Sequence, residues 1–239
     1  MLNPSLYLAL AALLISIGSG LYFLGWWYLT GKKYRFLLYW AWGLGTLLLF
    51  KLPNILINAE VEIIQEDLYP YFFLTLLLYF LAYFALIRGF AFFAGSSSVN
   101  RIAKWFMFGF ILAVLYFAAS FFIPGIGVKN APVWAAHLLF YSPAQVLLLR
   151  EIWKAARQPV RPKAISSPGL VLTAAGLICL TITSIIYITV QLGPYPAEFW
   201  YLSVIFSPDI SLWQVASGIL LFLGLASFGR SYIKNNPAG

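Results

Sequence analysis

Side chains that build most enzyme sites are scarce in this sequence. Its 239 residues include one cysteine, Cys179, and one histidine, His137. A single cysteine excludes a disulfide framework, and the two residues together are too few for a cysteine- or histidine-rich metal site. Serine-nucleophile motifs and phosphate-binding glycine loops are also missing from the sequence. We therefore expect no enzymatic activity, no bound metal and no cofactor.

Charged residues are scarce as well, at 9% of the chain, whereas apolar residues make up 62% and the mean hydropathy is +0.88. A typical soluble domain carries about 25% charged residues, so this composition argues against a soluble fold. Runs of about 20 apolar residues are long enough to cross the hydrocarbon layer of a membrane as helices. The sequence predicts an all-α, polytopic integral membrane protein.

Seven apolar stretches reach this length, which predicts a single seven-helix transmembrane bundle over residues 1–239. Pro53 and Pro143 remove backbone hydrogen bonds, so we expect them to kink the second and fifth helices. The expected spans are residues 5–29, 36–57, 69–93, 102–123, 132–152, 169–192 and 211–229.

Charge predicts the orientation of the bundle, because basic residues that flank membrane spans stay on the cytoplasmic side. With the N-terminus outside and the C-terminus in the cytoplasm, all but two of the 15 basic residues fall on inner segments. The exceptions are Lys51 and Lys129. The formal net charge of +8 is then a consequence of topology, and we expect no nucleic-acid partner. Short loops and the lack of disulfides are typical of a bacterial or archaeal plasma membrane protein.

Small residues predict where helices pack, because they allow close approach of two backbones inside a membrane. Ala12, Ser16 and Gly20 recur every four residues on one face of the first span. The pairs Gly43 with Thr46 and Gly218 with Gly224 are weaker versions of the same pattern.

Lys51 stands inside an apolar run, in "LLLFKLPNILINAEVE". At about 1.5 Å per residue it lies roughly 8 Å below the outer boundary of a ~30 Å hydrocarbon core, and His137 on the fifth span comes out at a similar depth. An ionisable group inside the membrane marks a functional site by default. The alternative is that the lysine stem reaches the outer headgroups or pairs with a loop carboxylate such as Glu60 or Glu62.

Other polar residues share the outer third of the predicted bundle, while the inner half has fewer. The predicted site is an outward-facing pocket that prefers a small anionic ligand, lined by Lys51, Asn54, His137, Tyr187 and Gln191. Further polar residues at this level are Asn58, Thr75, Tyr116, Ser120, Tyr141, Thr183 and Gln214, against Thr46, Gln145 and Thr173 in the inner half. Hydrogen bonds between helices are the ordinary alternative role for these side chains.

Three functions fit this description. The first is a receptor-like or ligand-binding membrane protein that signals through a separate membrane or cytoplasmic partner, since the inner loops are too short to hold a domain. The second is a small-solute transporter, and the third is a structural or accessory subunit of a larger membrane complex. Membrane lipids are expected partners in all three.

Two known families share the predicted number of helices. Microbial rhodopsins hold retinal on a lysine of the last helix, and the span 211–229 contains no lysine. The predicted topology resembles that of seven-helix sensor domains of bacterial membrane receptors, a resemblance of topology alone.

Overall fold

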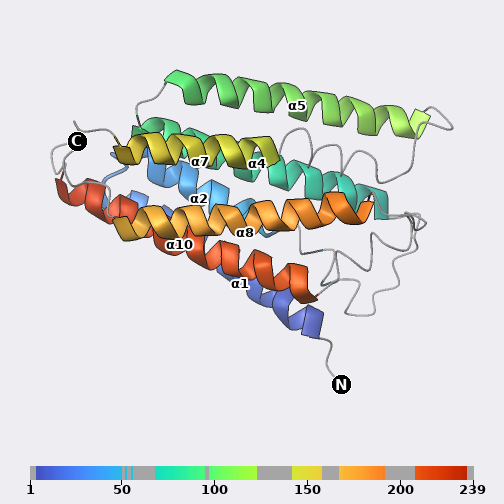
Figure 1. Cartoon of the computed structure of the whole chain (residues 1–239), viewed down its shortest axis with the longest axis horizontal. Helices are drawn as coiled ribbons and strands as arrows, with labels where there is room; N and C mark the ends of the chain where they lie inside the picture. The colour runs from blue at the N-terminus through green and yellow to red at the C-terminus, as the bar shows by residue number, and fades with distance from the viewer. Residues whose placement is uncertain are drawn as a thin grey trace.

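The computed structural model is all-helical in the residues it describes, which are 4–49, 52, 55, 68–94, 97–122, 142–157, 167–191 and 208–235. Seven α-helices lie in this part of the chain and run side by side along the long axis of the molecule (Figure 1). They are α1 (Pro4–Leu29), α2 (Arg35–Leu47), α4 (Leu68–Ala94), α5 (Ser97–Phe122), α7 (Ser142–Arg157), α8 (Ser167–Gln191) and α10 (Pro208–Asn235).

Three of these helices are long and apolar enough to cross a membrane. The qualifying segments are Leu6–Leu29 in α1, Pro168–Ile186 in α8 and Ile210–Lys234 in α10. At about 1.5 Å per residue each exceeds 25 Å in length, which is close to or beyond the thickness of the hydrocarbon layer. The outward face of α1 carries exposed apolar side chains such as Leu14 and Leu21, as a helix facing lipid does.

Neighbouring helices form a closed series of contacts. Helix α1 packs against α2 and α10. Helix α2 also packs against α4, and α10 packs most extensively against α8. Helix α7 joins α8 to α4, and α5 lies on the outside against α4 and α7 (Figure 1). The enclosed core is rich in aromatic rings, with Phe23, Trp40, Tyr83 and Phe106 fully buried. Four successive helices of the described part, α1, α2, α4 and α5, thus contribute to one interior.

The small residues on α1 do form a packing face, as the sequence predicted. Ala12 and Ser16 are buried, and a Cβ built on Gly20 would lie 2.8 Å from the Cα of Gly45 on α2. Since real Cβ atoms do not come this close to a backbone, only glycine permits this approach at position 20. A similar close approach occurs at Gly218, where a Cβ would lie 2.9 Å from the Leu48 side chain.

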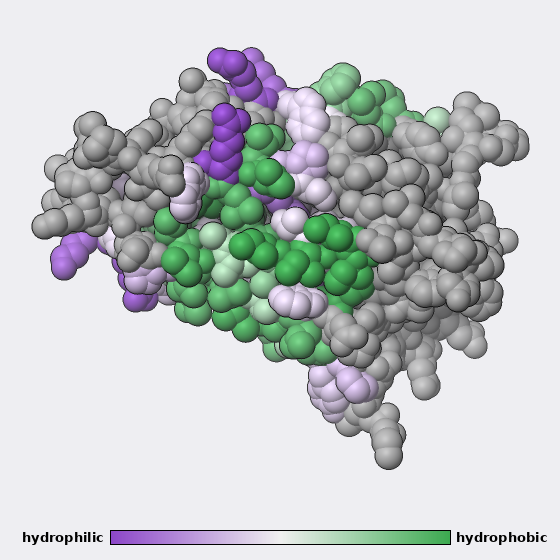
Figure 2. All heavy atoms as spheres, viewed as in Figure 1, coloured by the Kyte–Doolittle hydropathy of each residue, from purple (hydrophilic) through white to green (hydrophobic). Residues whose placement is uncertain are grey.

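Basic residues of the described part gather at one end of the bundle. Arg88 at the end of α4 donates to the side chain of Asn100 at the start of α5, at 2.6 Å. Arg230 near the end of α10 donates to the Tyr22 hydroxyl near the end of α1, at 3.0 Å. The other basic residues on these helix ends and on the α1–α2 turn are Lys32, Lys33, Arg35, Arg101, Lys104 and Lys234. Figure 2 shows the most hydrophilic atoms toward the left of the view, beside an apolar central surface.

The second helix is shorter than the sequence predicted. An uninterrupted span over residues 36–57 was expected, but α2 ends at Leu47, and Leu48 has φ −110° and ψ 6°. The chain is helical again at Leu52 and at Ile55. Thirteen residues give a helix of about 20 Å, so α2 reaches only part of the way along α1.

Candidate functional site

The five predicted site residues lie outside what the structure describes. Lys51, Asn54 and His137 are not among the described residues. Tyr187 and Gln191 belong to the last turns of α8, but their side chains are not described either. The pocket between Lys51 and His137 therefore stays a prediction.

A buried polar cluster joins three helices in the middle of the bundle. The Gln145 carboxamide on α7 donates through Nε2 to the Tyr83 hydroxyl on α4 and, at 3.3 Å, to the Ser184 hydroxyl on α8. All three side chains are at most 2% exposed. Hydrogen bonds between helices hold transmembrane segments together where no hydrophobic drive exists between them. This cluster fixes α7 against two neighbours.

Two buried carboxamides have hydrogen-bonding atoms without a partner in the described part of the chain. Oε1 of Gln145 is buried and accepts no hydrogen bond from the residues that the structure describes. Gln214 on α10 is fully buried, and neither its Nε2 nor its Oε1 is hydrogen-bonded to a described residue. An unsatisfied buried polar group costs about 1–3 kcal/mol, so a protein keeps one where another molecule or a special role compensates. These atoms are available for hydrogen bonds to water or to a small molecule inside the bundle.

Helix register places Gln214 close to the polar cluster. Helices α8 and α10 run antiparallel, because Gly176 lies against Leu221 and, three residues on, Thr173 lies against Gly224. Continuing this register in the other direction brings Gln214 level with Thr183, the residue beside Ser184. Four helices thus contribute buried polar side chains to one layer of the bundle.

The end of α2 lies in the same part of the bundle. The Ser16 hydroxyl on α1 donates to the backbone carbonyl of Leu44, at 2.5 Å, and accepts from the backbone N–H of Leu48, at 3.2 Å. In an uninterrupted α-helix these two backbone groups would bond to each other. A side chain has entered the hydrogen-bond ladder, which is a known cause of helix interruption. This is the physical reason that α2 stops at Leu47.

The contacts between α2 and α4 show how far along the bundle the end of α2 lies. Gly43 lies against Leu86, and Gly89 lies against the Trp40 ring, so the two helices are antiparallel. One further turn along the same register brings Thr46 level with Tyr83. The interrupted end of α2 and the Gln145 cluster are therefore at similar depth, and Lys51 follows that end in the sequence.

Sequence reasoning found part of this layer. Gln145 and Gln214 were recognised as polar residues, but Gln145 was assigned to the inner half and Gln214 to the outer third. The bond from Gln145 to Ser184 joins these two levels, so the polar layer is not confined to the outer third. Tyr83 and Ser184 were missed because tyrosine and serine are common in these helices, and nothing in the sequence pattern distinguishes them from packing residues.

The groups that meet here are hydroxyls and carboxamides, which bind by hydrogen bonds and do not supply a nucleophile with its base. Comparisons with protein-family models, with curated protein sequences and with solved structures find no match to this chain. The function must therefore be argued from these residues.

Proposed function

We propose that the chain is a multi-pass membrane protein with seven spans, an outer N-terminus and a cytoplasmic C-terminus. Three described helices have the length and hydropathy to cross a membrane. Helices α1 and α10 run parallel, because Ile15 lies against Gly218 and Trp26 against Gly229, as the first and seventh spans of a seven-span protein must. Exposed basic residues at one end favour that end as the cytoplasmic one.

In this proposal the protein is receptor-like and binds a small polar ligand inside its helix bundle. The observation that carries the proposal is Gln214, whose carboxamide is fully buried and finds no hydrogen-bond partner for either polar atom among the described residues. A ligand that offers one acceptor and one donor satisfies such a group. Oε1 of Gln145 adds a second acceptor in the same layer. The inner loops are short, so a signal passes to a separate protein through movement of the helices.

The predicted residues Lys51, Asn54, His137, Tyr187 and Gln191 extend this site toward the outer end in the proposal. Lys51 follows the interrupted end of α2 by four residues. A lysine beside the polar layer would select a ligand that carries a carboxylate or another anionic group.

Binding of simple probes to the purified protein tests the proposal. Acetate, lactate and acetamide are titrated in detergent, and the unfolding midpoint is recorded for the native chain and for Gln214→Leu and Gln145→Leu. We expect at least one probe to raise the midpoint of the native chain and to have no effect on either variant. Thr181→Val is the matched control, because the Thr181 hydroxyl donates within its own helix, to the carbonyl of Leu177 at 2.9 Å, and makes no bond to another described helix. Equal responses in all four proteins would overturn the proposal.

A second function, small-solute transport, is favoured by the interruption of α2. Transporter binding sites are often built where a membrane helix is discontinuous, because the freed backbone groups can bind the solute. Uptake of the same radiolabelled probes by proteoliposomes separates the two functions. Accumulation inside the vesicles identifies a transporter, and binding without accumulation identifies a receptor-like protein.

A further inference from the structure

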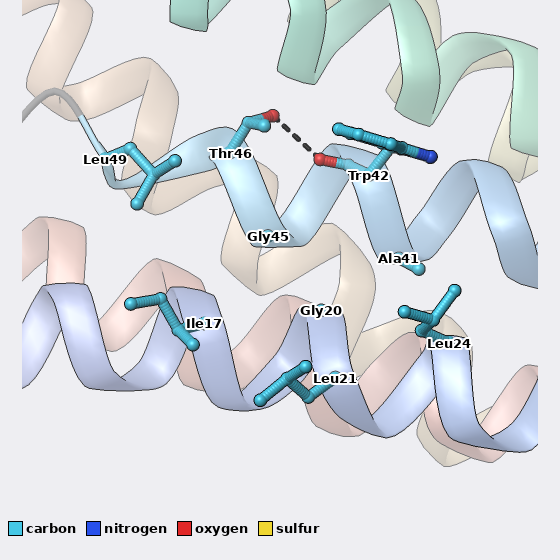
Figure 3. Close-up of a pocket in the computed structure, with 9 residues that line it drawn as sticks. All are labelled: Ile17, Gly20, Leu21, Leu24, Ala41, Trp42, Gly45, Thr46 and Leu49. Atoms are coloured by element: carbon cyan, nitrogen blue, oxygen red, sulfur yellow. Dashed lines mark hydrogen bonds between the residues drawn. The ribbon is translucent and has the colours of Figure 1, made fainter.

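A groove runs between α1 and α2 on the outer surface of the bundle (Figure 3). Its volume is about 410 Å³. The close approach of Gly20 and Gly45 forms the floor, and the walls are Ile17, Leu21 and Trp42. The Trp42 side chain is 63% exposed, so it forms a wall without being part of the packed core.

The groove offers almost no hydrogen bonds to an occupant. Its polar side-chain groups are the indole N–H of Trp42 and the hydroxyl of Thr46, which donates to the backbone carbonyl of Trp42 at 2.7 Å, as the dashed line in Figure 3 shows. A polar ligand would therefore lose its own hydrogen bonds on entry. A hydrocarbon chain loses none, and it gains contact with the glycine floor and the branched walls.

Charge at one end of the groove indicates what the hydrocarbon chain is attached to. Leu24 and Ala41 line the end of the groove that lies toward the α1–α2 turn. Lys33 and Arg35 of that turn are exposed, and Arg35, the first residue of α2, lies about 9 Å from Ala41 along the helix axis, at about 1.5 Å per residue. Basic side chains beside a membrane span attract anionic lipid headgroups. The separation suits a lipid whose phosphate lies at the turn and whose chain descends between the helices.

We propose that this groove binds one anionic phospholipid, with an acyl chain on the Gly20–Gly45 floor and the phosphate beside Lys33 and Arg35. The site is separate from the buried polar layer. It depends on the membrane placement proposed above, and it does not depend on the ligand proposed for Gln214.

Native mass spectrometry of the full chain, released from detergent micelles, tests the site. Phosphatidylglycerol and phosphatidylcholine with identical acyl chains are titrated separately. We expect one tightly held phosphatidylglycerol per chain and weaker binding of phosphatidylcholine. The double variant Lys33→Gln, Arg35→Gln should weaken the binding of phosphatidylglycerol by about fivefold for each charge removed. Its control is Arg101→Gln, Lys104→Gln, which removes the same charge at the same end of the bundle, on α5.

A second pair of variants tests the groove itself. Trp42→Ala removes one wall of the groove and should weaken the binding of both lipids several-fold. Trp213→Ala removes another exposed tryptophan, on α10, and should change the binding of neither lipid. Equal binding of the two lipids to the native chain, or equal effects of the two tryptophan variants, would overturn the site. The Gln214→Leu variant should bind the lipid as the native chain does, so loss of lipid binding and loss of solute binding are distinguishable.

Discussion

The hydroxyl of Ser16 bridges two backbone groups of α2, the carbonyl of Leu44 and the N–H of Leu48, at 2.5 and 3.2 Å. These groups are hydrogen-bond partners in a regular helix, so one side chain from α1 both interrupts α2 and satisfies the interruption. Inside a membrane this second role matters, because irregular backbone is tolerated there only where protein or water satisfies it.

Replacing Ser16 with alanine should destabilise the protein by about 1–3 kcal/mol, because buried backbone groups of α2 lose their partner. Thermal unfolding in detergent measures the change. Ser19→Ala is the matched control, since Ser19 is also buried on α1 but makes no hydrogen bond to α2 in the described part of the chain. Equal unfolding midpoints for the two variants would show that α2 does not depend on the Ser16 hydroxyl.

Gly20→Ala should be destabilising, by about 1–3 kcal/mol, because the added Cβ would lie 2.8 Å from the Cα of Gly45 and force α1 and α2 apart. Gly18→Ala is the control on the same helix, because nothing lies within 4 Å of a Cβ at that position. We expect the control to be neutral or slightly stabilising, since alanine favours the helix more than glycine does. A loss of stability at both positions would indicate a general intolerance of α1, not a close contact with α2.

The sequence was sufficient to place several of the described helices, because a long apolar run favours a helix, in which the backbone groups bond to one another. Helix α1 begins one residue before the expected span and ends at the expected Leu29, and α4 extends the expected span by one residue at each end. Helix α10 continues to Asn235, six residues past its expected end, because a helix need not stop where its apolar stretch does.

The interruption of α2 was not predictable from composition. Pro53 indicated a local kink, whereas the helix ends six residues earlier, at Leu47, where Ser16 enters the hydrogen-bond ladder. That contact depends on a residue on another helix, so no pattern within the second span reveals it. The Tyr83–Gln145 hydrogen bond is a similar case, because the two residues are 62 positions apart in the sequence.

Gln214→Leu should raise the unfolding free energy by about 1–3 kcal/mol in the absence of ligand, because a buried carboxamide without partners is replaced by an apolar side chain of similar size. Gln145→Leu should have the opposite effect, since it leaves the Tyr83 and Ser184 hydroxyls without the amide that joins them. Chemical or thermal unfolding of the two variants gives the sign of each change. A destabilised Gln214→Leu would mean that the native carboxamide has a partner that compensates its burial.

The C-terminus should be cytoplasmic. A reporter that is active only in the cytoplasm, fused after Gly239, is expected to be active, and one that is active only after export is expected to be silent. Because α1 and α10 run parallel, the start of α1 lies at the opposite end of the bundle from Lys234. An active exported reporter would reverse the orientation of the whole bundle and with it the outward direction of the predicted pocket.

Lys51→Met should lower the binding of an anionic ligand while the yield of folded protein holds or improves. A lysine at the centre of a membrane helix is disfavoured by at least about 2.5 kcal/mol, less at a shallower depth, so its presence in an apolar run calls for a partner. Methionine keeps roughly the same length and removes the charge. Lys129→Met is the control, because Lys129 is the other basic residue on the predicted outer side and lies between two spans. If Lys51→Met changes neither acetate nor lactate binding, and neither probe is transported differently, Lys51 pairs with a loop carboxylate and the accessory-subunit function becomes the better explanation of the chain.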